Sequence, residues 1–215
     1  MSLDGRKRSD ARGEATRTAL IEAAESLFAE SGVEAVSTRQ IGAAIGSSNT
    51  NVVAYHFGSK HALILEVYRH RLPAIDRRRR ELLDRADAQG RGRDLVELIR
   101  VFWRPLFEQT DGMGRHSYAR FLAGLERSGL IETRQQVNSE FPETDRLTAR
   151  LVEVLPAEVR PWLRNRMRLT TRLVCGALLQ IDRSTDVSWQ ECEAMFEDAI
   201  LMAAAAISTP PAKQT

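Results

Sequence analysis

Apolar residues recur at helical spacing along almost the whole chain, and no segment shows the alternation typical of a strand. Near the N-terminus, Leu20, Ala24 and Phe28 lie on one face of a helix expected over residues 14–31. The same periodicity predicts later helices over residues 75–88, 93–109, 115–128, 143–154, 157–182 and 188–207. The chain is therefore predicted to be all-α.

The composition is that of a globular protein, with 43% apolar and 28% charged residues. There is no apolar run long enough to span a membrane and no secretory signal pattern, so we expect a cytoplasmic protein without a membrane partner. Cys175 and Cys192 lie within apolar helical patterns, which predicts buried thiols in a reducing compartment rather than a disulfide.

One window of the chain lacks acidic residues altogether. Asp and Glu number 29 among 215 residues, yet none lies between Glu34 and Glu66. The window is rich in short polar side chains and contains Arg39, His56 and Lys60 as basic groups. Because carboxylates repel phosphates at short range, their absence favours a surface that approaches nucleic acid. The net charge of +2 is too small to say this of the whole chain.

The same window has the punctuation of a helix-turn-helix. Gly32 is a left-handed stop for the first helix. Ser37 and Gln40 form the capping box of a second helix, which Gly46 ends. A third short helix is expected over residues 49–56. These lengths are typical of a DNA-binding head.

Residues 16–70 resemble the N-terminal domain of TetR-family transcriptional regulators. The matching segments are Ile21–Val33, Val36–Ile41 and Tyr55–Lys60. The last segment, an aromatic-His-Phe sequence followed by a Lys that opens the next helix, is the most specific. The chain departs from the family in one respect: Gly46 and Phe57 are one residue farther apart than usual, so recognition-helix positions do not transfer directly across Ser47–Ala54.

The resemblance implies a three-helix DNA-binding head followed by a helical domain for effector binding and dimerisation. We expect a flexible basic arm over residues 1–13, the head over residues 14–58 and a linking helix over residues 59–72. Pro73 is expected to break the helix, and residues 73–215 to form the second domain.

Candidate DNA contacts are Thr38, Arg39, Ser48, Asn49, Thr50, Asn51, Tyr55, His56 and Lys60. Thr38 and Arg39 open a helix, which suits either phosphate contact or a solvated helix start. Residues 48–51 contain Asn and Thr, which bind adenine and thymine edges but also favour turns. Tyr55 and His56 resemble family residues that bond phosphates; for Tyr55 a core position is the alternative. Lys60 combines a cation with a helix N-terminus.

Aromatic residues on neighbouring predicted helices suggest an effector pocket, with ordinary core packing as the alternative. The candidates are Phe102, Trp103, Phe107, Tyr118, Phe121 and Trp162, with Arg120 or His116 as polar partners.

The last two predicted helices carry apolar stripes with small residues. Pairing with a second copy would make a four-helix bundle. The stripe residues proposed for this interface are Leu163, Met167, Val174, Ala177, Ile181, Phe196, Ala199, Ile200 and Ala203. The alternative is that both helices pack only within one subunit.

No enzyme signature is found. The four histidines lack metal-ligand spacing, so neither a metal nor a cofactor is expected. The run Arg77–Arg80 lies beside Glu81 and Asp84, which favours a solvated helix face with ion pairs over a nucleic-acid patch.

The sequence therefore predicts a homodimeric repressor that binds double-stranded DNA with a two-fold symmetric operator. An apolar or amphipathic small molecule would release it. The alternatives are a regulator controlled by a protein partner without an effector, and a helical enzyme with a head-like domain.

Overall fold

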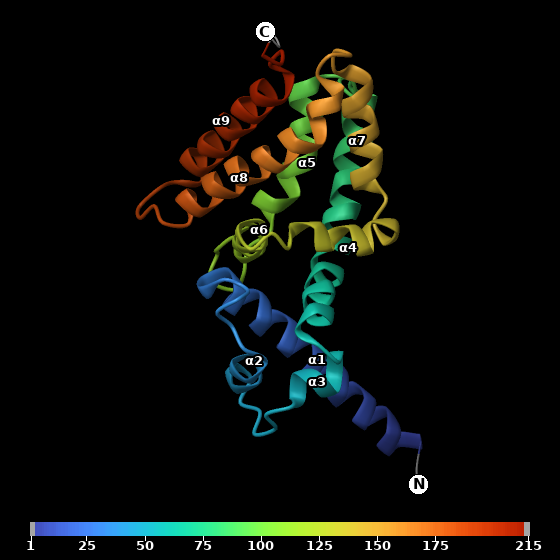
Figure 1. Ribbon diagram of the computed structural model, residues 1–215, viewed down its shortest axis with the longest axis vertical. Helices are drawn as coiled ribbons and strands as arrows, with labels where there is room; N and C mark the ends of the chain where they lie inside the picture. The colour runs from blue at the N-terminus through green and yellow to red at the C-terminus, as the bar shows by residue number, and fades with distance from the viewer. Residues whose placement is uncertain (1–2, 213–215) are drawn as a thin grey trace.

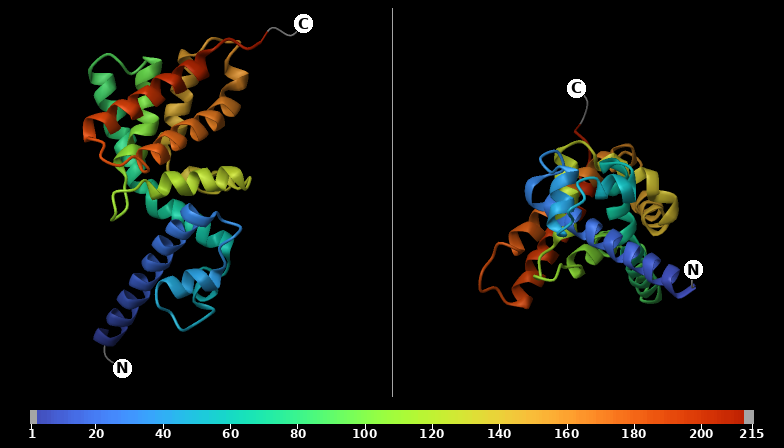
Figure 2. Two further views of the ribbon diagram at one scale, coloured as in Figure 1. Left: turned by 90° about the vertical axis from the view of Figure 1, so that its left-hand side faces the viewer. Right: turned by 90° about the horizontal axis from the view of Figure 1, so that it is seen from below.

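The computed structural model describes residues 3–212, and all regular structure in that range is helical. A smaller N-terminal head and a larger C-terminal body lie at opposite ends of the molecule (Figures 1 and 2). The predicted all-α class is confirmed. Across residues 3–212, no helix has the length and apolar character that a membrane crossing requires.

The head consists of α1 (Leu3–Ser31), α2 (Thr38–Ala44), α3 (Val52–Phe57) and the first part of α4 (Lys60–Ala88). Its core is formed by buried apolar residues from all four helices: Leu20, Ala24, Phe28, Ile41, Val53, Leu63 and Val67.

The helix α1 is longer than predicted. Residues 3–13, expected to belong to a flexible arm, continue α1 instead, and residues 1–2 of that arm lie outside the described residues. The segment contains Leu, Arg, Lys and Ala, which favour helix, and no proline interrupts it.

The predicted capping box of α2 is present. The Ser37 hydroxyl accepts a hydrogen bond from the Gln40 backbone N–H (3.2 Å), and the Gln40 side-chain oxygen accepts one from the Ser37 N–H (2.7 Å). Two N–H groups that the helix itself leaves free are thereby satisfied.

The predicted break at Pro73 is wrong, because α4 runs unbroken through Pro73 and joins the head to the body. Proline removes one backbone hydrogen bond, but Pro73 is exposed while Leu72 and Ile75 beside it stay buried. Packing of that buried face keeps the helix continuous.

The rest of the body wraps around the C-terminal half of α4. Its elements are α5 (Leu95–Glu108), α6 (Ser117–Arg127), the 3-10 helix η1 (Ile131–Glu140), α7 (Glu143–Val154), the 3-10 turn η2 (Arg160–Trp162), α8 (Leu163–Ile181) and α9 (Trp189–Ser208). Two predictions need correction here: the expected loop over residues 128–142 contains η1, and α8 begins at Leu163 rather than at 157. The helix α6 and η1 lie between the head and the rest of the body (Figures 1 and 2).

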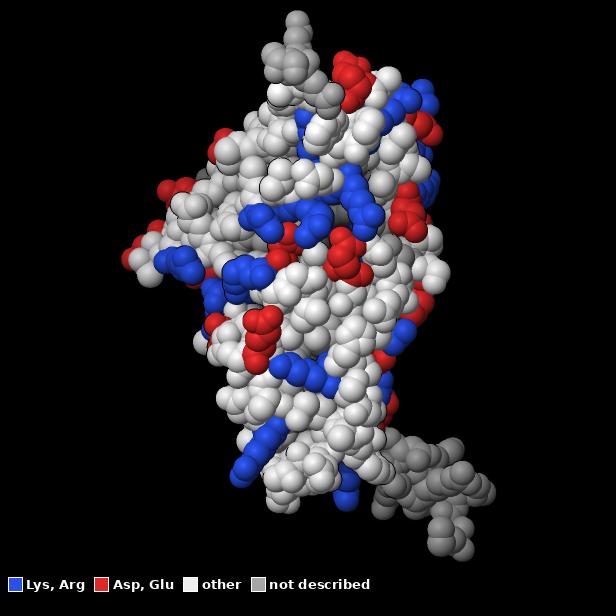
Figure 3. All heavy atoms as spheres, viewed as in Figure 1, with Lys and Arg blue, Asp and Glu red and all other residues white. Residues whose placement is uncertain are grey.

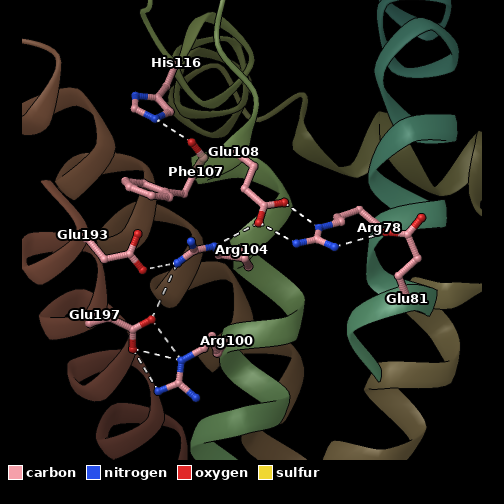
Figure 4. A network of polar contacts seen from close by, with 9 residues as sticks. All are labelled: Arg78, Glu81, Arg100, Arg104, Phe107, Glu108, His116, Glu193 and Glu197. Carbon is pink, nitrogen blue, oxygen red and sulfur yellow. Dashed lines mark hydrogen bonds and ion pairs between the residues drawn. The ribbon is translucent and has the colours of Figure 1, made fainter. Parts of the chain in front are cut away.

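Ion pairs hold α5 between α4 and α9 (Figure 4). Arg78 on α4 donates to both carboxylate oxygens of Glu108 on α5 (2.7 and 2.9 Å). Arg104 on α5 bonds Glu108 and also Glu193 on α9. These contacts cover one side of α5 and leave its opposite side facing the interior.

The apolar stripes of α8 and α9 face the interior of their own subunit. Val174, Phe196, Ala199, Ile200 and Ala203 are fully buried. Leu163 and Ile181 are also buried, and Met167 and Ala177 are half-buried. The prediction that this stripe meets a second copy is therefore corrected. The opposite face of the two helices exposes Leu169, Leu201 and Met202.

Candidate nucleic-acid interface and internal cavity

The acid-free window forms the tip of the head. The turn between α2 and α3 lies at the end of the head away from the body, as does the start of α1 (Figure 1), and Figure 3 shows basic and uncharged side chains around the turn. Arg39, Ser48, Thr50 and Tyr55 are exposed there. The tip therefore presents polar and basic side chains from a stretch of sequence that contains no Asp or Glu.

The turn is longer than the sequence suggested. The helix α3 begins at Val52, so residues 49 and 50 belong to the turn and Asn51 is the N-cap. The Asn49 side-chain oxygen accepts a hydrogen bond from the Asn51 N–H (2.9 Å), and the Ser47 hydroxyl accepts one from the Asn49 N–H (3.2 Å). The side-chain oxygen of Asn49 thus serves the turn, while residues 48–51 all remain exposed.

Two predicted phosphate contacts have different surroundings. Tyr55 is 81% exposed, which excludes the core position considered for it, and its ring meets the half-buried His56 edge-on at 5.0 Å. Lys60 instead turns inward: its ammonium donates to the carbonyl of Val36 and lies 5.7 Å from the Phe28 ring. Burial lowers the pKa of Lys60.

Arg17, which the sequence analysis missed, fixes the position of α3. Its guanidinium donates to the carbonyl of His56 (3.1 Å), pairs with Glu66 on α4 and lies 4.5 Å over the Phe57 ring. One α1 side chain therefore ties α3 to α1 and α4. The only sequence signal was an arginine next to the apolar face of α1.

The body contains a cavity of about 520 Å³ among α4, α5, α6, η1, α7 and α8. Figure 3 shows a hollow on this side of the body, among a row of basic side chains. Its apolar lining includes Leu72, Ile75, Phe102, Trp103, Leu106, Tyr118, Leu122 and Leu163.

Three of the six predicted pocket residues line the cavity: Phe102, Trp103 and Tyr118. The other three do not. Phe107 stacks on Phe196 (4.6 Å between ring centroids), Phe121 stacks on Phe28 of the head (6.1 Å), and Trp162 is 45% exposed. Helical spacing identified an apolar face but not which neighbouring helix each ring meets.

The polar partners proposed for the pocket belong elsewhere. His116 Nδ1 lies 2.6 Å from Asp182, its Nε2 lies 3.0 Å from the Phe107 carbonyl oxygen, and Arg120 donates to the same Asp182 (3.0 Å). Burial opposes ionisation of Asp182, but the hydrogen bonds from His116 and Arg120 outweigh it and lower the pKa of Asp182. This cluster joins α6 to the end of α8.

The polar residues of the cavity were not foreseen. Arg79 lies in the arginine run predicted to be a solvated face, yet it is 4% exposed and lines the cavity. Its neighbours do form ion pairs: Arg78 pairs with Glu108, and the exposed Arg80 pairs with the buried Glu143. Arg134 and Thr144 join Arg79 in the cavity lining.

A second cluster links the head to the body. Glu25 of α1 is 1% exposed and accepts two hydrogen bonds from Arg71 of α4 (2.6 and 2.8 Å). Ser117 at the start of α6 also donates to Glu25. The next residue, Tyr118, lines the cavity. The helix α6 therefore contacts both the cavity and the head.

A family comparison matches the part of the chain that forms the head. The family model described as "Bacterial regulatory proteins, tetR family" matches residues 20–67. Among solved structures, the TetR family transcriptional regulator PfmR from Thermus thermophilus matches with 22% identity and a TM-score of 0.49. The match covers 85% of this chain and 97% of that chain. No curated protein matches the chain.

A helix-turn-helix head carried on a helical body defines a DNA-binding regulator, and the family match falls on this head. The head therefore carries the DNA-binding domain of the TetR family of bacterial regulatory proteins, over residues 20–67.

Proposed function

We propose that the protein is a cytoplasmic homodimeric repressor that binds a two-fold symmetric operator and is released by a small molecule in the body cavity. The observation that carries the proposal is the tip of the head. An exposed turn, the start of α2 and the outer face of α3 lie together there within a stretch free of carboxylates.

The DNA contacts divide by chemistry. Ser48, Thr50 and Asn51 are proposed to reach base edges, because they are exposed in front of α3. Thr38, Arg39, Tyr55 and His56 are proposed to contact phosphates and so to fix the orientation of the head. Asn49 and Lys60 are assigned supporting roles, since their polar atoms already bond the turn and the Val36 carbonyl.

Dimerisation is proposed through the exposed face of α8 and α9, not through the buried stripe. Leu169, Leu201 and Met202 are 51%, 53% and 48% exposed, and clustered exposed apolar side chains mark interaction surfaces. Two copies that pair these faces would form a four-helix bundle and present two heads with two-fold symmetry.

Release is proposed to act through α6 and α4. A ligand in the cavity touches Tyr118 and Leu122 on α6 and Leu72 on α4. These helices hold the head through Glu25 and Phe28 of α1. A small shift of either helix changes the separation of the two heads, which must match half-sites about 34–36 Å apart. A regulator without an effector would be expected to fill such a cavity with side chains.

Selection of bound duplexes from a random pool, repeated over a series of salt concentrations, tests DNA recognition. We expect a two-fold symmetric consensus and affinity that falls steeply with salt, because phosphate contacts release counterions. Equal binding to all duplexes, or affinity independent of salt, would contradict the proposal. Repeating the selection with a metabolite library tests release by a ligand.

A further inference from the structure

We infer that the cavity takes an organic anion, with an apolar body against Phe102, Trp103 and Leu163 and a carboxylate against Arg79 and Arg134. The inference rests on the proposed function only in treating the cavity as the effector site. Beyond that function, the inference specifies the charge of the ligand and the residues that bind the charged group.

Arg79 is a buried cation without an acidic partner. Its Nε and Nη2 donate to the carbonyl oxygen of Phe102 (3.1 and 2.9 Å), and its Nη1 donates to the Thr144 hydroxyl (2.7 Å). Its guanidinium lies 4.4 Å over the Phe102 ring. No carboxylate in the described part of the chain forms an ion pair with Arg79. A buried charge left without a counterion is costly.

Two acidic residues near Arg79 have other hydrogen-bond partners. Asp76, one turn before Arg79 on α4, accepts a hydrogen bond from the backbone N–H of Glu143 (3.0 Å). The Glu143 carboxylate pairs with Arg80 (2.9 Å) and Arg146 (3.2 Å). Glu143 therefore neutralises other arginines. Asp76 acts on Arg79 only through its nearby charge, which raises the pKa of Arg79 less than burial and Arg134 lower it.

A second guanidinium meets Arg79 in the cavity. Arg134 of η1 donates to the same Thr144 hydroxyl oxygen (2.7 Å) that Arg79 bonds. Burial, together with the positive charge of Arg134, lowers the pKa of Arg79. A carboxylate between the two guanidinium groups would relieve their repulsion and accept charge-assisted hydrogen bonds from both.

The apolar wall of the cavity is formed by aromatic rings as well as aliphatic side chains. Phe102, Trp103 and Tyr118 all line it, so the body of the ligand would meet flat apolar surfaces beside the two guanidinium groups.

Two exposed arginines of the cavity lining, Arg164 and Arg168, differ from Arg79 and provide matched controls. Arg164 is exposed and pairs with Glu132 (2.8 Å), and Arg168 pairs with Glu126 (3.5 Å) and Glu132 (3.6 Å). The charges of Arg164 and Arg168 are already compensated by these glutamates. The carboxylate is therefore assigned to the buried Arg79, with Arg134 beside it across Thr144.

The test compares probes that differ only in the head group: decanoate, decanol and decylamine. The chain has three tryptophans, and Trp103 lies in the cavity wall. Replacing the other two by Trp162→Phe and Trp189→Phe leaves Trp103 as the single tryptophan, so its fluorescence reports binding. We expect decanoate to bind about 10- to 100-fold more tightly than decanol, as hydrogen bonds to charged groups imply, and decylamine to bind most weakly. Absence of decanoate binding, or equal binding of decanol, overturns the inference.

Variants in the same background locate the anion. Arg79→Gln is expected to remove the preference for decanoate over decanol, and Arg79→Lys to retain part of it. Arg164→Gln, the exposed matched control, is expected to leave the preference intact. Preference lost with Arg164→Gln but kept with Arg79→Gln contradicts the assignment. If circular dichroism shows that Arg79→Gln does not fold, the Arg79→Lys variant and the comparison of the three probes test the inference instead.

Operator binding without a probe separates this inference from the proposed function. Specific DNA binding without carboxylate binding refutes only the assignment of the ligand. Carboxylate binding without specific DNA binding refutes only the proposed repressor.

Discussion

Phe121→Ala and Phe102→Ala make the same chemical change in two surroundings, a closed core and a cavity wall. Phe121 is fully buried, and its ring centroid lies 6.1 Å from that of Phe28, 5.6 Å from Tyr68 and 5.9 Å from Tyr118. Phe102 is 9% exposed and borders the cavity of about 520 Å³.

The two surroundings predict different losses of stability. Phe121→Ala removes a ring from close packing and creates a new void, so we expect a loss of about 3–5 kcal/mol in the free energy of unfolding. For a chain of this size that corresponds to roughly 6–20 °C in Tm. At Phe102 the void already exists, so mainly the transfer contribution is lost, about 1.5–3 kcal/mol.

Urea unfolding followed by circular dichroism measures both losses, and Trp103 fluorescence measures ligand binding. Phe102→Ala should weaken binding of a cavity ligand, because that ring is part of the wall and lies against Arg79. Phe121→Ala should leave ligand contacts in place. A smaller loss of stability for Phe121→Ala than for Phe102→Ala would refute the distinction between core and cavity wall.

Three further predictions concern the head, the dimer and acid stability. Lys60→Ala should destabilise the head by about 0.5–1.5 kcal/mol, because a hydrogen bond is lost, and leave base preference unchanged in a binding selection. A change in base preference would contradict this role. Leu201→Glu should give a folded monomer in sedimentation and melting experiments, whereas Ala203→Glu should prevent folding, because Ala203 is fully buried. A folded dimer with Leu201→Glu would place the interface elsewhere. Burial opposes ionisation of Glu108, but hydrogen bonds from Arg78 and Arg104 lower its pKa below the ordinary 4.5. This group therefore contributes stability above pH 4.5 that is lost as the pH falls further, and Glu108→Gln should flatten that dependence in acid melting curves. An unchanged acid dependence would exclude this contribution.

The sequence by itself determined the helical class, the main helices and the helix-turn-helix. These features depend on residues three or four positions apart, such as the capping pair Ser37 and Gln40. The family resemblance lay in the same local segments, and the match over residues 20–67 confirms it. The long helix through Pro73 escaped prediction because packing of its neighbours outweighed the lost hydrogen bond.

Only the tertiary structure decided which groups face one another. Successive helix residues point about 100° apart, so in a run of four arginines Arg79 faces a cavity while Arg78 and Arg80 pair with the carboxylates of Glu108 and Glu143. An apolar stripe on α8 or α9 shows that a face is buried, but not whether its own subunit or a second copy covers it. Lys60 likewise reaches inward because the Val36 carbonyl lies beside it. Contacts between residues far apart in the chain depend on how the helices pack against one another, and the spacing of residues within one helix does not determine that packing.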